Sequence, residues 1–96
     1  MPKYILSPAA QTSLKNIRAY SLENFGRPRA MSYLKALRDS MTMLAETPLK
    51  GKARDDIKKN YYSYFEGSHT IYYRISKTHI DIIDVLHQRM EPKIHL

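Results

Sequence analysis

The sequence predicts an α+β fold in which an N-terminal strand and two helices precede a three-stranded antiparallel meander, in the order β-α-α-β-β-β. Two observations support this. Apolar residues recur at helical spacing through the first half of the chain, and the apolar period changes to two after residue 60. The chain has 96 residues, which suffices for one domain and leaves no room for a second. We therefore expect a single domain over residues 1–96, with the helices packed on one face of the sheet.

The first elements are expected to be a short strand and a capped helix. Lys3 to Leu6 is apolar enough for a strand, and Ser7-Pro8 resembles a helix N-cap followed by proline at the first helical position. Gly26 is expected to end this helix. Its stripe at helical spacing is Ala10, Leu14, Ile17 and Ser21, and Phe25 continues this stripe one turn on.

A second helix is predicted to follow directly and to end before Pro48, because the residue preceding proline avoids the helical region. Its stripe is Ala30, Leu34, Leu37, Met41 and Leu44. The short link at Gly26 predicts an antiparallel helical hairpin, with Leu34, Leu37 and Met41 facing the sheet. Residues 48–60 show no period and are interpreted as a loop.

The second half of the chain predicts a meander. Its three strands are expected at Tyr61–Glu66, His69–Ser76 and His79–Leu86, which are rich in Tyr and Ile. Gly67-Ser68 suits a two-residue type II′ turn, and Lys77-Thr78 is the expected second turn. This register places Arg74 opposite Asp81, an arrangement that favours it because opposite charges across strands attract.

The same register divides the strands into two faces. The face expected under the helices contains Tyr62, Tyr64, Ile71, Tyr73, Ile75, Ile80, Ile82 and Leu86. The other face is mixed and is expected to line a groove or contact a partner; it contains Tyr61, Ser63, Phe65, Tyr72, Arg74, His79, Asp81, Ile83, Val85 and His87.

Composition restricts the partners and the location. Sixteen basic against nine acidic residues give a net charge of +7, which favours an acidic partner such as nucleic acid or an acidic protein. The basic excess lies before residue 61, whereas six of the ten aromatic residues fall between Tyr61 and Tyr73. This separation weakens an interpretation as a base-stacking nucleic-acid binder.

The remaining composition points to a cytoplasmic protein without a cofactor. The chain has no cysteine, which excludes disulfides and thiolate zinc sites and fits a reducing cytoplasm. No apolar run approaches the roughly 18 residues of a membrane span, so no membrane association is expected, nor is a signal peptide. The histidines are scattered, and neither a metal site nor another cofactor is expected.

An ordered set of segments resembles a known family. The segments are Tyr4–Ala10, Phe25-Gly26, Ala30 with Tyr33, Leu34 and Leu37, Leu44–Pro48, Gly51-Lys52, Gly67–Arg74 and Val85–Met90. Together they resemble ParE-type toxins of the RelE/ParE superfamily of bacterial toxin–antitoxin systems. The resemblance implies a helical hairpin packed on an antiparallel sheet, and a cognate ParD-like antitoxin that is acidic in its toxin-binding segment. It implies inhibition of DNA gyrase for the ParE branch and ribosome-dependent mRNA cleavage for the RelE branch.

Three functions are consistent with these observations. The first is a ParE-like toxin that inhibits DNA gyrase by binding, without chemistry of its own and without direct sequence-specific DNA binding by the toxin alone. The second is a RelE-type mRNA endonuclease, in which Arg74 would hold the phosphate and His87 would move protons. The third is a toxin-derived module that binds its partner and has lost toxicity.

Each candidate residue also has a structural interpretation. Arg74 can simply pair with Asp81, and His87 can be a hydrogen-bonded residue at a strand end. The cations of residues 50–59 (Lys50, Lys52, Arg54, Lys58 and Lys59) fit a phosphate site or a solvated loop equally well. The residues proposed for partner binding are Tyr61, Tyr72, Arg74, His87, Tyr20, Phe25 and Tyr33. The last three lie near the hairpin tip, where they fit ordinary packing or an apolar platform for a partner helix.

Overall fold

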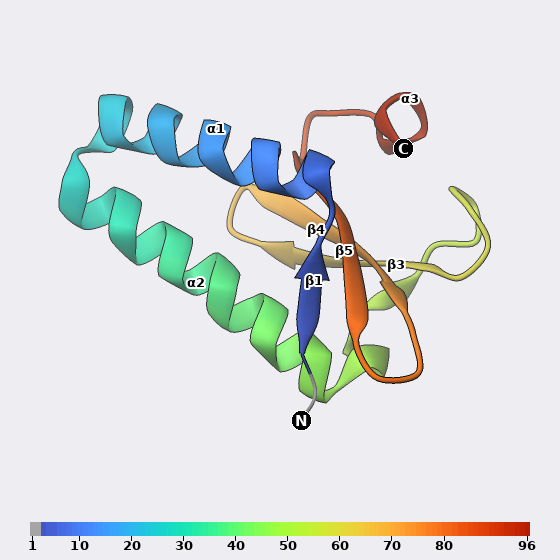
Figure 1. Cartoon of the computed structure of the whole chain (residues 1–96). Helices are drawn as coiled ribbons and strands as arrows, with labels where there is room; N and C mark the ends of the chain where they lie inside the picture. Colours follow the sequence, from blue (N-terminus) through green and yellow to red (C-terminus); the bar gives the residue numbers. More distant parts are fainter. Residues whose placement is uncertain (1–2) are drawn as a thin grey trace.

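A computed structural model describes residues 3–96 and shows two long helices against a five-stranded sheet (Figure 1). The expected order of elements is confirmed, with a short helical turn, a two-residue strand and a C-terminal helical turn added. The elements are β1 (Tyr4–Leu6), α1 (Pro8–Phe25), α2 (Arg27–Glu46), the 3-10 turn η1 (Pro48–Lys50), β2 (Lys52–Ala53), β3 (Tyr61–Glu66), β4 (His69–Ile75), β5 (Ile80–His87) and α3 (Pro92–His95). No helix within residues 3–96 is long and apolar enough to cross a membrane.

The helix boundaries follow from the capping residues. The Ser7 hydroxyl accepts a hydrogen bond from the amide of Ala10 at 3.0 Å, and Pro8 occupies the first turn of α1. Gly26 lies between the helices with φ 81° and ψ 168°, a conformation open to glycine. From Gly26 the helices run in opposite senses and diverge as a V over the sheet (Figure 1).

The sheet order is β1-β5-β4-β3-β2. β1 is parallel to β5, with Tyr4 opposite Ile80 and Leu6 opposite Ile82, and the other pairs are antiparallel. Strand β2 pairs with β3 at the opposite edge, so the interpretation of residues 48–60 as a loop throughout is wrong. The backbone there is held by Tyr73, whose hydroxyl donates to the carbonyl of Pro48 at 2.6 Å.

The register of the meander is confirmed at both turns. Gly67 has φ 58° and Glu66 lies opposite His69, as the type II′ turn requires. Across the second turn, Arg74 lies opposite Asp81, and their side chains approach to 3.5 Å.

A β-bulge in β5 overturns part of the expected face assignment. Tyr73 lies opposite Ile82, but Tyr72 lies opposite Asp84, so Ile83 is an extra residue in β5. Every residue after Ile83 therefore moves to the other face of the sheet. Val85 and His87, expected on the mixed face, lie on the helix side. Leu86, expected under the helices, lies opposite Thr70 on the far side.

The core lies between the helices and the near face of the sheet, as expected. Leu37 and Met41 are fully buried there, and Leu34 is half-buried against them. The buried cluster is Ala10, Ile17, Leu37, Met41, Leu44, Ala45, Ile71, Tyr73, Ile80, Ile82 and Val85.

The far face does not form the expected open groove along its whole length. Tyr61, Ser63 and Tyr72 are buried by the chain itself. The segment after β2 crosses this face, and the Arg54 guanidinium lies 6.0 Å from the ring centroid of Tyr72. Phe65, by contrast, is 68% exposed near the turn into β4.

Candidate functional site

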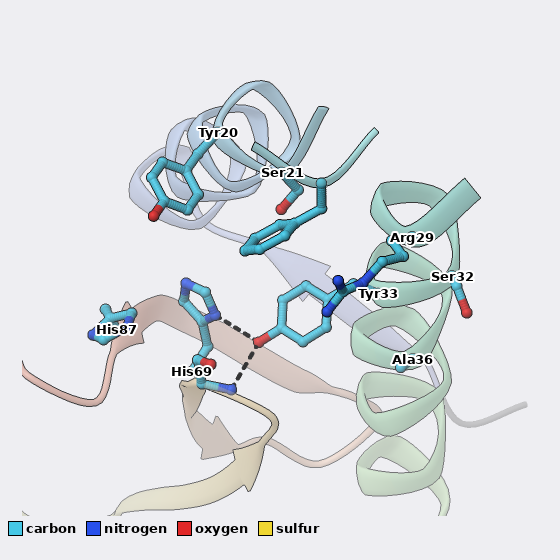
Figure 2. Close-up of a pocket in the computed structure, with 10 residues that line it drawn as sticks. Tyr20, Ser21, Arg29, Ser32, Tyr33, Ala36, His69 and His87 are labelled. Carbon is cyan, nitrogen blue, oxygen red and sulfur yellow. Dashed lines mark hydrogen bonds between the residues drawn. The ribbon is translucent and has the colours of Figure 1, made fainter. Parts of the chain in front are cut away.

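An open pocket of about 510 Å³ lies between the tip of the helical hairpin and the β3–β4 turn (Figure 2). Helix α1, helix α2, the turn and the end of β5 each contribute to it. The lining residues are Tyr20, Ser21, Phe25, Arg29, Ser32, Tyr33, Ala36, Ser68, His69 and His87. The pocket brings together four of the residues proposed for partner binding: Tyr20, Phe25, Tyr33 and His87.

Tyr33 docks helix α2 onto the β3–β4 turn. Its hydroxyl lies 2.6 Å from Nδ1 of His69 and accepts a hydrogen bond from the amide of Ser68 at 3.1 Å (Figure 2). Burial raises the pKa of Tyr33, so the phenol stays protonated at neutral pH. A Cβ at Gly67 would lie 2.5 Å from Cε1 of Tyr33. Both this close approach of the ring and the positive φ of residue 67 therefore favour glycine at this position.

His69 forms the floor of the pocket. Burial lowers the pKa of His69, and the neighbouring His87 lowers it further, so the His69 ring is neutral at pH 7. The rings of His69 and His87 meet edge to face, with their centroids 5.4 Å apart. The Tyr33 hydroxyl has one proton and two acceptors within reach, the carbonyl of Glu66 at 3.1 Å and Nδ1 of His69 at 2.6 Å.

His87 is held in a comparable way. Its Nδ1 accepts a hydrogen bond from the amide of Arg89 at 3.1 Å, which assigns the proton of the neutral ring to Nε2. The following residue, Gln88, donates from its side chain to the carbonyl of Gly67 at 2.8 Å. The end of β5 is thus fastened to the β3–β4 turn.

The outer wall of the pocket is aromatic. Tyr20 and Phe25 lie edge to face with centroids 6.3 Å apart, and they are 62% and 49% exposed. The guanidinium of Arg29 lies over the Phe25 ring, 4.8 Å from its centroid. Two large exposed rings beside a cation form a surface suited to binding a partner.

The other proposed residues lie elsewhere. Arg74 and His69 are five positions apart on β4, so they project to opposite faces about 17 Å apart along the strand. Since His87 lies opposite His69, the structure does not bring Arg74 and His87 together. The Asp81 carboxylate lies 3.5 Å from the Arg74 guanidinium and 3.0 Å from Nε2 of His79. This ion pair favours the structural interpretation of Arg74.

Two of the cations in residues 50–59 have partners within the chain. Arg54 donates to Asp56 at 3.0 Å, and this hydrogen bond raises the pKa of Arg54 and lowers the pKa of Asp56. The Lys58 ammonium lies 6.0 Å from the centroid of the Tyr61 ring. Within residues 3–96, no group of three or more His, Asp or Glu side chains is arranged to hold a metal ion.

Sequence reasoning missed His69 and Arg29. His69 was open to prediction, because the type II′ turn places it opposite Glu66 and on the same face as Ile71. Its contact with His87 was not, because that contact depends on the bulge at Ile83. Arg29 lies one turn beyond Phe25 across the helix break, where periodicity carries no signal.

Comparison with known proteins identifies the family. Residues 4–92 match the model of the ParE toxin of the type II toxin–antitoxin system parDE. The chain is 39% identical over 90 residues to a protein named Toxin ParE1 from Mycobacterium tuberculosis, covering 93% of this chain and 92% of that protein. It is 34% identical over 96 residues to Toxin ParE1 of Caulobacter vibrioides, covering 100% and 99%.

Solved structures share the fold. A chain described as the chromosomal ParDE system from P. aeruginosa superposes with a TM-score of 0.75 at 13% identity, covering 91% of this chain and 95% of that one. A chain of the RelBE2 toxin–antitoxin complex from Mycobacterium tuberculosis gives 0.63 at 22% identity, covering 92% and 100%. With the family match over nearly its whole length, the chain belongs to the ParE toxins of type II toxin–antitoxin systems.

Proposed function

We propose that this ParE toxin acts in the cytoplasm by binding and inhibiting DNA gyrase, and that a ParD-like antitoxin with an acidic segment neutralises it. The observation that supports binding over mRNA cleavage is the separation of Arg74 from His87 on opposite faces of the sheet. Cleavage of a phosphodiester requires a proton acceptor, a proton donor and a phosphate-holding cation around one bond. These two side chains do not converge on a common point.

The test is a DNA supercoiling assay with purified gyrase, run beside an in-vitro translation assay on the same toxin preparation. We expect supercoiling to be inhibited and the mRNA in ribosomes to stay intact. Ribosome-dependent cuts that disappear in a His87→Gln variant with native circular dichroism would contradict the proposal and establish the nuclease.

The antitoxin is expected to associate by electrostatic steering. The net charge of +7 attracts an acidic segment over a distance that salt shortens, while apolar contacts determine how long the complex lasts. Raising the salt concentration from about 50 to about 500 mM should slow association several-fold, as measured by stopped-flow or surface binding. An association rate that does not change with salt would exclude steering.

A further inference from the structure

The pocket at the hairpin tip offers hydrogen-bond donors that have no partner within it. Nδ1 of His69 is taken by the Tyr33 hydroxyl, and Nδ1 of His87 is taken by the amide of Arg89. Because Nδ1 of His87 accepts from that amide, the His87 proton lies on Nε2, which can only donate. In Figure 2 the second ring nitrogen of His69 points away from Tyr33, toward Tyr20.

The remaining polar groups of the pocket suit an anion. Arg29 adds a guanidinium, which also only donates, and Ser68 adds a hydroxyl that can donate or accept. Within residues 3–96, none of the ten residues that line the pocket is acidic. Glu66 is not among the lining residues, and its carboxylate accepts a hydrogen bond from the hydroxyl of Ser40. A ligand with a negatively charged oxygen would thus meet donors and no carboxylate among the lining residues.

The walls of the pocket suit an apolar group next to that charge. Tyr20 and Phe25 are large and exposed, and they stand beside Arg29 at the mouth. A volume of about 510 Å³ lies within the range of sites that enclose a small ligand or a pair of side chains. Bare phosphate would leave the aromatic walls unused, whereas an acidic residue next to an apolar one would contact both parts.

We propose that this pocket binds a carboxylate of the antitoxin, namely an Asp or Glu side chain flanked by an apolar or aromatic residue. The carboxylate accepts a hydrogen bond from Nε2–H of His87 beside the His69 ring and pairs with Arg29, while the flanking side chain packs on Tyr20 and Phe25. This inference rests on the proposed antitoxin partner, and the toxin's charge of +7 supports an acidic occupant.

The experiment uses the toxin alone and two probes of equal shape. The probe 3-phenylpropanoate carries an aromatic ring and a carboxylate, and 3-phenylpropanamide replaces the carboxylate with a neutral amide. Imidazole ¹H–¹⁵N spectra at pH 7 report on each histidine during titration. We expect saturable shifts at His69 and His87 with a Kd of about 1 mM, as befits so small a ligand, and binding of the amide at least about tenfold weaker. His79 and His95, outside the pocket, serve as internal controls.

A matched pair of variants tests the role of the cation. Arg29→Gln should weaken binding of the carboxylate probe about three- to tenfold and leave the affinity for the amide probe unchanged. Arg38→Gln removes an exposed cation from the same helix outside the pocket and should change neither. Both positions are exposed, so the fold is expected to survive in each variant.

Two dipeptides and inorganic phosphate test whether the pocket prefers a peptide carboxylate to a free anion. Acetyl-Phe-Asp-amide should bind more tightly than acetyl-Phe-Asn-amide, with shifts at the same two histidines. Equal binding of both peptides, or tighter binding of inorganic phosphate than of either, would overturn the proposal. None of these measurements involves gyrase or the antitoxin, so a failed titration would reject the pocket assignment while leaving toxin activity and neutralisation to their own assays.

Discussion

Truncating Leu37 to alanine tests whether helix α2 is oriented as the structure has it. Leu37 is fully buried between α2 and the sheet. The change removes three carbon atoms from the core, which costs about 2.4 kcal/mol at about 0.8 kcal/mol per methylene. A cavity of roughly 80 Å³ that stayed open would add about 2 kcal/mol. We therefore expect the free energy of unfolding to fall by about 2–4.5 kcal/mol.

The assay is chemical denaturation of the purified toxin, followed by circular dichroism. Leu34→Ala is the matched control, because it makes the same change three residues earlier on the same helix. Leu34 is half-buried, so its loss should be clearly smaller, at about 1–2 kcal/mol. A loss below about 0.5 kcal/mol at Leu37, or a larger loss at Leu34 than at Leu37, would show that the helical phase is wrong.

Three further changes test the turn, the β2 segment and the buried histidine. Gly67→Ala should lower the free energy of unfolding by about 2 kcal/mol or more, through the positive φ and the 2.5 Å approach to the Tyr33 ring; a neutral result would contradict that approach. Tyr73→Phe removes the hydroxyl that donates to Pro48 at 2.6 Å and should cost about 1–3 kcal/mol in urea denaturation, with an unchanged midpoint as the opposing outcome. Because the folded state lowers the pKa of His69, the unfolded chain binds more protons below about pH 6.5, and stability should decline as the pH falls from 7 toward 5. His69→Gln should flatten this decline, and an equal slope in the variant would assign it to other groups.

The aromatic residues proposed for partner binding differ in how accessible they are. Tyr61 and Tyr72 were proposed for partner binding, but both are buried against the segment that follows β2. Contact with a partner at these two rings would require that segment to move. Tyr20 and Phe25 are accessible without any rearrangement.

Features set by neighbours in the chain were predictable from the sequence. The spacing of Ala30, Leu34, Leu37 and Met41 determines which side of α2 is buried, because 3.6 residues make one turn. The cap at Ser7 and the turn at Gly67-Ser68 depend on side chains and dihedral angles within a few residues. The strand pairing on either side of that turn follows from its length, which is why Tyr62 was correctly placed opposite Tyr73.

Features set by contacts between distant residues required the tertiary structure. The bulge at Ile83 is held from the start of α1, since the Ser7 hydroxyl donates to the Ile83 carbonyl at 2.6 Å. Ser13 donates to the buried carboxylate of Asp84 at 2.6 Å. These partners lie more than 70 residues away, and the local alternation of β5 carries no sign of them. The extra residue moves His87 to the helix side and into the pocket with His69, so the makeup of the candidate site was decided by packing between the two ends of the chain.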